Sequence, residues 1–134
     1  MAVTASDIIR RAMRLIGMLD ANESMEAADS EDALDTLNAL FAEWRGSGIP
    51  VPDYSVAAPT TELTLDLADR EAVAYQLAVR LSPEYGASMT AEARISMSES
   101  WGRMQLRYFQ PGKVNFRELP YPTGRYDVTT DRYY

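Results

Sequence analysis

The sequence predicts a mainly α-helical protein, with a compact domain of about four helices at residues 1–109 and an extended C-terminal arm at residues 110–134. Apolar residues recur at intervals of three and four in four separate segments, the spacing that places them on one face of a helix. Glycine and proline separate these segments and recur through the last 25 residues, where they prevent a long helix.

The first expected helix begins near Ser6, with Asp7 in its first turn, where a carboxylate favours the positive end of the helix dipole. Its apolar residues share one face, and the opposite face is basic, formed by Arg10, Arg11 and Arg14. We interpret this basic face as the solvated side of an amphipathic helix. Contact with DNA or with a partner is the alternative.

An acidic connector at residues 18–32 precedes the second expected helix. That helix starts near Ser30, whose hydroxyl can cap free backbone N–H groups, and it ends at Gly46. It carries a single apolar stripe made of Leu34, Leu37, Phe41 and Trp44. An extended path through two prolines, Pro50 and Pro52, follows.

Apolar and polar residues alternate over residues 61–67, a period of two that predicts a short β segment. Helical spacing then returns over residues 69–81, where Val73, Leu77 and Leu81 form one stripe, and over residues 88–109. The stripe of the last helix consists of Ala93, Met97, Trp101, Met104 and Tyr108. Because Trp44 and Trp101 both lie in apolar stripes, we expect them to be buried in the core.

The composition limits the catalytic and metal-binding groups that the chain can use. Cysteine and histidine are absent from the 134 residues, which removes thiolate nucleophiles, the usual general base and the commonest metal ligands. We therefore expect no metal, no cofactor and no enzymatic activity. No apolar run is long enough for a membrane-spanning helix or a signal peptide, so we expect a soluble product made in a cytoplasm, with no membrane contact.

The net charge is −7, and it is unevenly distributed. Residues 1–109 hold 17 acids against 9 arginines, whereas residues 110–134 hold 4 bases against 3 acids. An acidic body argues against broad binding to nucleic acid through phosphates. The net charge does not exclude a local cluster of arginines that faces DNA.

Two motifs weakly resemble functional sites, one a calcium-binding loop and the other a pair of catalytic carboxylates. Residues 20–31 match the oxygen-bearing positions of an EF-hand loop, but Met25 occupies the position that requires glycine, so an acidic loop explains them better. Glu43 and Glu84, each beside an aromatic residue, are the two acids that a carboxylate hydrolase would use. No spacing indicates that they face each other.

The final segment is rich in aromatic residues for a tail without regular structure. Residues 110–134 hold four of the chain's eight tyrosines and four further apolar residues, among them Phe116 and Leu119. Disordered tails are usually poor in aromatics, whereas spaced anchors suit a chain that lies along another protein. Folding back onto its own domain is the alternative.

The order of several short motifs resembles one family. They are the arginine-bearing first helix, Ala42-Glu43-Trp44 followed by Gly48-Ile49, the stretch Leu77-Ala78-Val79-Arg80-Leu81-Ser82-Pro83-Glu84-Tyr85-Gly86, and Leu119-Pro120-Tyr121-Pro122-Thr123-Gly124. This succession, over about residues 6–126, resembles the head-to-tail adaptors of short-tailed bacteriophages, also called tail accessory factors or packaged-DNA stabilisation proteins. The tail after Tyr126 is shorter than is usual there.

The resemblance implies a structural protein of the virion, located at the head–tail junction. Members form a ring of twelve copies beneath the portal protein, extend the channel through which double-stranded DNA passes, retain packaged DNA and carry the downstream tail or nozzle protein. Their C-terminal segment docks on the portal. Carried over by position, the portal-binding residues are Phe116, Leu119, Tyr121, Pro122 and Tyr126. Arg10, Arg11 and Arg14 are candidates for the DNA channel or a subunit interface.

Two other classes stay open at this point. One is the connector ring protein of long-tailed phages, which usually reaches its partners without so aromatic an arm. The other is a carboxylate-based cell-wall glycosidase built on Glu43 and Glu84.

Overall fold

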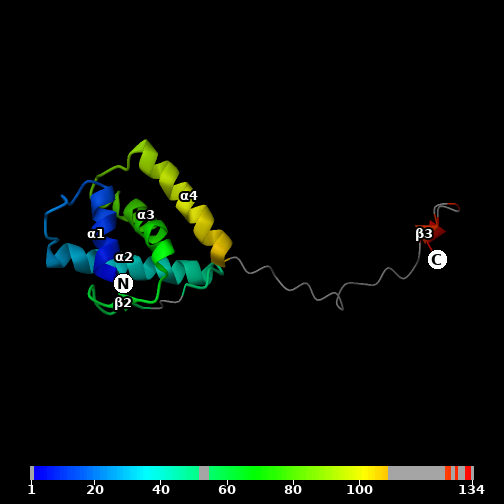
Figure 1. Cartoon of the computed structure of the whole chain (residues 1–134), viewed down its shortest axis with the longest axis horizontal. Coiled ribbons are helices and arrows are strands. Elements are labelled where there is room, and N and C mark those ends of the chain that lie inside the picture. Colours follow the sequence, from blue (N-terminus) through cyan, green and yellow to red (C-terminus); the bar gives the residue numbers. More distant parts are fainter. Residues whose placement is uncertain (1, 52–54, 109–125, 128, 130–131, 134) are drawn as a thin grey trace.

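The computed structural model describes residues 2–51, 55–108, 126–127, 129 and 132–133. Within them the chain forms four α-helices, as the sequence predicts (Figure 1). These are α1 (Ala5–Leu15), α2 (Ala27–Gly46), α3 (Arg70–Leu81) and α4 (Ala91–Tyr108). A 3-10 helix, η1 (Leu67–Asp69), leads into α3. The strands are β1 (Val3–Thr4), β2 (Glu62–Leu63), β3 (Tyr126–Asp127) and β4 (Arg132–Tyr133).

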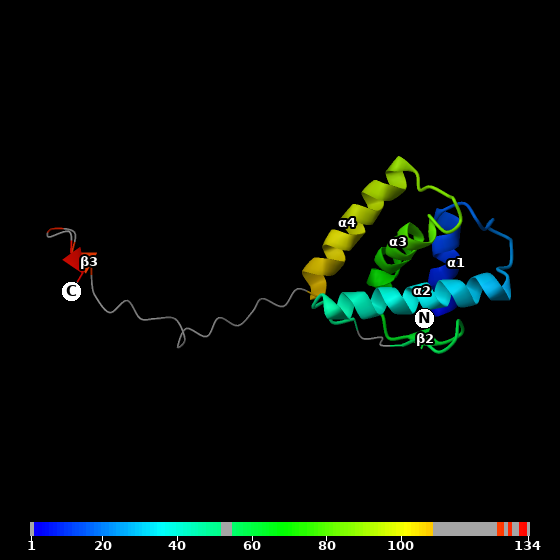
Figure 2. The same cartoon turned by 180° about the vertical axis from the view of Figure 1, so that it is seen from behind.

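Helix α3 lies at the centre of the helical body. It packs against α1, α2 and α4, and both views show it between α1 and α4 (Figures 1 and 2). Its predicted stripe of Val73, Leu77 and Leu81 is completely buried. Burial of several such side chains, each contributing about 1.5–3 kcal/mol, stabilises the helices more than their intrinsic propensities do.

Helix α1 begins at Ala5, one residue before the predicted start, because Thr4 caps it. The Asp7 backbone N–H donates to the Thr4 hydroxyl oxygen at 3.3 Å, and the Thr4 backbone N–H donates to the Asp7 carboxylate at 3.1 Å. This reciprocal pair is a capping box. The hydrogen bonds from the Thr4 side chain and backbone lower the pKa of Asp7 below its ordinary value.

The predicted start of the second helix at Ser30 is wrong, because α2 begins three residues earlier at Ala27. The Ser30 backbone N–H donates to the Glu26 carbonyl at 3.1 Å, so Ser30 is already inside the helix. Its side chain is buried and caps nothing. Two alanines, which favour helix strongly, and Asp29 in the first turn extend the helix toward the connector.

The predicted β segment at residues 61–67 is shorter than its alternating pattern indicates. Glu62–Leu63 pairs antiparallel with Val3–Thr4, with Leu63 opposite Val3. Leu65 is also buried, but Leu67 is 59 % exposed because the chain turns into η1 there. The Asp66 carboxylate caps that turn by accepting from the Ala68 N–H at 3.2 Å.

Residues 47–56 connect α2 to the β2 side of the body. Gly48 has φ +85°, a conformation that favours glycine and ends the helical path. Farther along, Asn38 of α2 holds Val56 in place, since its side-chain amide donates to the Val56 carbonyl at 3.0 Å and accepts from the Val56 N–H at 2.8 Å. Val51 and Val56, on either side of residues 52–54, are both buried and belong to the core.

Candidate functional site

The carboxylate of Asp69 fixes the last turn of α4 at the place where the predicted arm begins. It is 1 % exposed and accepts a hydrogen bond of 2.6 Å from Arg107 Nη1 and one of 2.9 Å from the Tyr108 hydroxyl. Asp66 adds a longer ion pair with Arg107, at 3.9 Å. The two contacts to Asp69 join residues 38 and 39 positions apart, so they tie the end of α4 to the start of α3.

Tyr108 carries the largest pKa shift in this cluster. Burial of the phenol and its hydrogen bond to Asp69 raise the pKa of Tyr108 to about 12. An ionised phenol would face the Asp69 carboxylate at close range, which disfavours ionisation. The Tyr108 hydroxyl therefore stays protonated and donates to Asp69 across the physiological pH range.

Aromatic side chains form a second contact between α4 and the body. The rings of Trp44 and Trp101 lie 4.9 Å apart between centroids, with 36° between their planes, and Phe41 contacts Trp44 at 6.0 Å. Trp44 is buried and Trp101 is partly buried against the core. The predicted burial in the core is confirmed for Trp44, whereas Trp101 packs against the core and is only partly buried.

Most of the predicted portal-binding residues lie outside the described part of the chain. Phe116, Leu119, Tyr121 and Pro122 belong to that undescribed stretch, and Tyr126 is described only as part of β3. There Tyr126 pairs with Tyr133 of β4 in an antiparallel register. The β3–β4 pair does not join the β1–β2 sheet. The portal contacts and the division of the chain at residue 109 remain predictions.

The three arginines of α1 are placed differently from one another. Arg11 pairs with Glu71 of α3, its Nη2 lying 3.2 Å from the carboxylate oxygen. Arg14 donates to the Ala21 carbonyl at 2.8 Å and so fixes the connector. Arg10 is exposed. Arg11 and Arg14 therefore have hydrogen-bond partners within the body, and Arg10 and Arg14 are both exposed.

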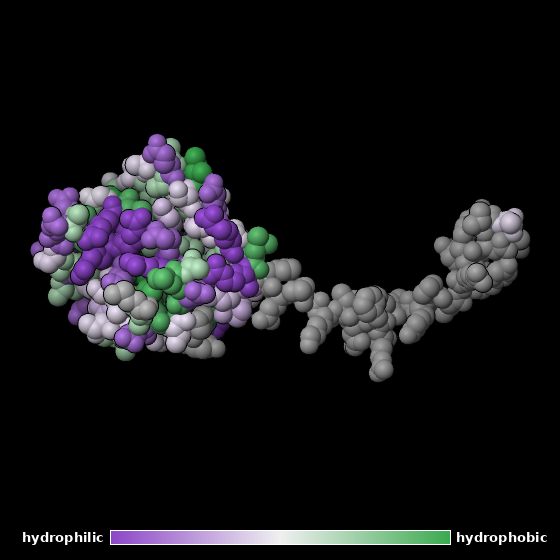
Figure 3. All heavy atoms as spheres, viewed as in Figure 1, coloured by the Kyte–Doolittle hydropathy of each residue, from purple (hydrophilic) through white to green (hydrophobic). Residues whose placement is uncertain are grey.

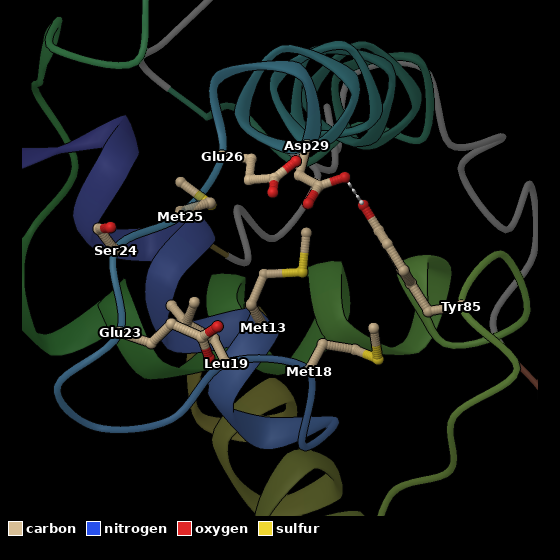
Figure 4. A pocket seen from close by; sticks show the side chains of 9 residues that line it. All are labelled: Met13, Met18, Leu19, Glu23, Ser24, Met25, Glu26, Asp29 and Tyr85. Carbon is tan, nitrogen blue, oxygen red and sulfur yellow. Dashed lines mark hydrogen bonds between the residues drawn. The ribbon is translucent and has the colours of Figure 1, made fainter.

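A small pocket opens between the connector, the start of α2 and the turn after α3 (Figure 4). Its volume is about 120 Å³. Sulfur-bearing and acidic side chains dominate its lining, which consists of Met13, Met18, Leu19, Glu23, Ser24, Met25, Glu26, Asp29 and Tyr85. The Tyr85 hydroxyl donates to Asp29 at 3.3 Å, and burial together with this carboxylate raises the pKa of Tyr85.

The resemblance of residues 20–31 to an EF-hand does not extend to their structure. The second half of the stretch is already helical, because α2 begins at Ala27, whereas the calcium loop needs its ligands arranged around one point. Among the residues that the structure describes, no three acidic side chains gather closely enough to hold a metal ion.

Glu43 and Glu84 lack the surroundings that a carboxylate hydrolase needs. Glu43 is exposed and forms an ion pair with Arg80 of α3, and Glu84 is exposed in the turn after α3. A general acid requires a carboxyl held in an apolar pocket, so that its protonated form persists near neutral pH. Neither residue lies in such a pocket.

The face of the body seen in Figure 3 is mainly hydrophilic, and hydrophobic atoms stand out near the two ends of α4 and in a patch lower on the body. Of the 18 residues of α4, Met104 alone is buried. Ile95 and Leu106 are 61 % and 78 % exposed. Helix α4 therefore covers the core with one narrow face and leaves large apolar side chains on another.

The sequence did not reveal that Asp69 holds the last turn of α4, from which the predicted arm continues. The sequence indicates only an acid just before a helix, a position that usually means dipole stabilisation. Its partners are almost 40 residues away, and no local periodicity connects them. The capping turn formed by Asp66, which points the following residues inward, would have been the one available signal.

No helix in the described part of the chain has the length and apolarity that crossing a membrane requires. Comparison with families of known proteins gives one finding. A family model described as P22 tail accessory factor matches residues 1–134.

Proposed function

Because this chain belongs to the P22 tail accessory factor family, matched over its full length, we propose that it is the head-to-tail adaptor of a phage virion. Membership gives it a structural role associated with the phage tail. The proposal goes further: copies of the chain form a ring, twelve in number by the resemblance, that docks beneath the portal protein. The ring extends the DNA channel, retains packaged DNA and carries the next tail component.

The observation that best supports this proposal is the way in which the end of α4, just before the arm, is held in place. Asp69 joins the last turn of α4 to the centre of the body through Arg107 and Tyr108, so residue 108 has a defined position and direction. A segment that starts from a fixed point loses less freedom on docking than one that starts from a frayed helix end. The arm is thus presented to a partner from a rigid base.

The mechanism we propose is multivalent assembly. A single extended arm loses conformational entropy when it binds, so one copy alone holds the portal weakly. Copies bound side by side act together, and each arm then binds at a high effective concentration. The aromatic and proline anchors assigned to the portal, Phe116, Leu119, Tyr121, Pro122 and Tyr126, supply the contacts.

We also propose that the chain is not an enzyme and that its charge serves DNA passage. The body carries a clear excess of acids over arginines, so a channel lined by it repels phosphates and lets DNA slide. Arg10, one of the two exposed arginines of α1, is a candidate for contact with the last packaged DNA. A channel lined mainly by Arg10, Arg11 and Arg14 would contradict the repulsive lining.

Deletion of residues 111–134 tests the proposal. We expect the shortened chain to keep the far-ultraviolet circular dichroism of its four helices and to lose binding to the portal in sedimentation. A variant in which Phe116 and Tyr121 are both replaced by alanine separates aromatic anchoring from arm length. Unchanged portal binding by both variants would reject the proposed role of the arm.

A further inference from the structure

Helix α4 carries a line of exposed residues on the side opposite its buried Met104. Ile95 and Leu106 are large apolar residues exposed by more than half, and the eleven positions between them correspond to about three helical turns, so they share a face. Gly102 and Arg103 lie between them near the same face. We call Ile95, Gly102, Arg103 and Leu106 the α4 strip.

Among the residues that the structure describes, nothing requires a glycine at position 102. It lies inside α4, where glycine weakens a helix relative to alanine, and its backbone has no positive φ that would require glycine. A Cβ atom added there would meet no heavy atom within 4 Å. Packing inside the subunit therefore tolerates a side chain at this position. A partly exposed glycine between Ile95 and Leu106 allows another molecule to approach the helix closely.

The pocket of Figure 4 offers a surface of matching chemistry. Met13, Met18 and Met25 give it flexible, polarizable walls that adapt to an inserted side chain. Glu23, Glu26 and Asp29 give it negative charge, and within the described part of the chain the ion pairs are made by other acids: Glu71, Glu43, Asp66 and Asp69. The pocket is thus suited to an arginine flanked by apolar groups.

These two surfaces lie on opposite sides of the body. The connector that lines the pocket and helix α4 are separated by α1 and α3 in both views (Figures 1 and 2). Complementary surfaces on opposite sides produce a head-to-tail contact between copies, which closes into a ring when the rotation between copies allows it.

We propose that the α4 strip of one copy docks in the methionine-rich acidic pocket of the next copy. Arg103 enters among the carboxylates of Glu23 and Glu26, while Leu106 packs on Met18. This inference deepens the proposed ring and rests on it, since it names the faces that meet. Glu99, one turn before Arg103, keeps the strip from being strongly basic, so the contact depends on shape and apolar area together with one charge pair.

Arg103 is favoured over the other exposed cations of the body. Arg94, on the same helix, lines a different hollow together with Val79, Met89 and Met97. Arg10 lies on α1, beside Asp7. Arg103 is the cation that lies among the exposed apolar residues of the strip, where neighbouring Leu106 would seal the charge pair from water.

The absence of cysteine from the chain allows a direct test by disulfide trapping. Leu106→Cys and Met18→Cys are made in separate chains, mixed, and oxidised, both at high concentration in solution and bound to the portal. We expect a cross-link between the two variants and none within either variant alone. Thr60→Cys, exposed beside β2, replaces Met18→Cys as the matched control and should give no cross-link.

A cross-link formed by Leu106→Cys with itself would show a symmetric contact and overturn the proposal. So would the absence of a mixed cross-link in both settings. The result is separable from the test of the arm, because deletion of residues 111–134 affects portal binding whereas the trap reports contact between helical bodies.

Gly102→Ala gives an independent test with two readouts of opposite sign. Alanine should raise the melting temperature by about 3–6 °C, since it strengthens an open helix position. It should also weaken association between copies about tenfold, because the methyl group blocks close approach. Association equal to or stronger than that of the unchanged chain would contradict the docking of the α4 strip.

Charge reversal tests the pairing of Arg103 with the pocket. Arg103→Glu and Glu26→Arg should each lower the yield of the mixed cross-link about tenfold, and the two together should restore much of it. Arg94→Glu is the matched control and should leave the yield unchanged. Failure of the double reversal to restore the cross-link would remove Arg103 from the contact.

Discussion

Arg107 donates to Asp69 at 2.6 Å across 38 positions of sequence, and this pair joins the end of α4 to the entry of α3. The carboxylate is almost fully buried, whereas 39 % of the arginine side chain remains exposed. The pair therefore links the core to the surface in the last turn of α4, shortly before the arm begins. Removal of the carboxylate charge should affect both stability and the presentation of the arm.

Asp69→Asn is expected to lower the free energy of unfolding by about 1–3 kcal/mol, because it leaves Arg107 with a weaker acceptor in a partly buried place. Urea denaturation followed by circular dichroism measures this loss. Asp66→Asn is the matched control, since Asp66 is 64 % exposed and lies 3.9 Å from Arg107. We expect that control to cost under about 0.5 kcal/mol. Equal losses in the two variants would contradict a special role for Asp69.

Tyr108 predicts a loss of stability at alkaline pH. Its pKa is about 12 in the folded chain against an ordinary value of 10.0, so the unfolded chain releases the phenolic proton first as the pH rises. The contribution of Tyr108 is complete below pH 10 and is lost between about pH 10 and 12. Urea unfolding of the unchanged chain and of Tyr108→Phe should differ most below pH 10, and the difference should shrink above it. A constant difference across this range would exclude the Asp69 contact as its cause.

The capping box of α1 predicts the effect of changing Thr4. Thr4→Ala removes the acceptor for the Asp7 N–H and should cost about 1 kcal/mol of unfolding free energy. Thr4→Ser keeps the hydroxyl and should cost less than half as much. Because Thr4 lowers the pKa of Asp7, the penalty of Thr4→Ala should be full above pH 4 and decrease as the pH falls below it, where the carboxylate is protonated. Thermal unfolding at pH 7 and pH 3 provides the measurement.

The surroundings of Glu43 and Glu84 predict an absence of wall-degrading activity. Purified chain should release no more reducing sugar from peptidoglycan than a buffer blank, because neither acid is held in an apolar pocket. The double variant with glutamine at both positions is the control. Turnover that the double variant loses would establish a hydrolase and contradict the structural role.

Helices were predicted well from sequence where a stripe faced the core. The stripe of α3 is completely buried as expected, and the rings of Trp44 and Trp101 meet as two such stripes should. Burial of apolar area depends on spacing along one helix, and spacing is visible in sequence. Helix ends were predicted less well: α1 is capped by Thr4 and begins before Ser6, and α2 begins before Ser30.

The features that position the arm were not visible in sequence, for a physical reason. Asp69 acts through partners almost 40 positions away, and alternation over residues 61–67 continued in sequence after β2 had ended. A strand persists only while it has a neighbour to pair with, and β1 offers two residues. The sequence also gives no reason to single out Gly102, because only the structure shows that a Cβ atom added there would meet no described heavy atom within 4 Å.

The most direct measurement is an electron cryo-microscopy reconstruction of the intact particle at the junction of head and tail. The adaptor account predicts that Phe116, Leu119, Tyr121, Pro122 and Tyr126 lie against the portal and are covered by it. Aromatic residues of the arm packed on the helices of their own subunit, or without density in a complete particle, would contradict the account.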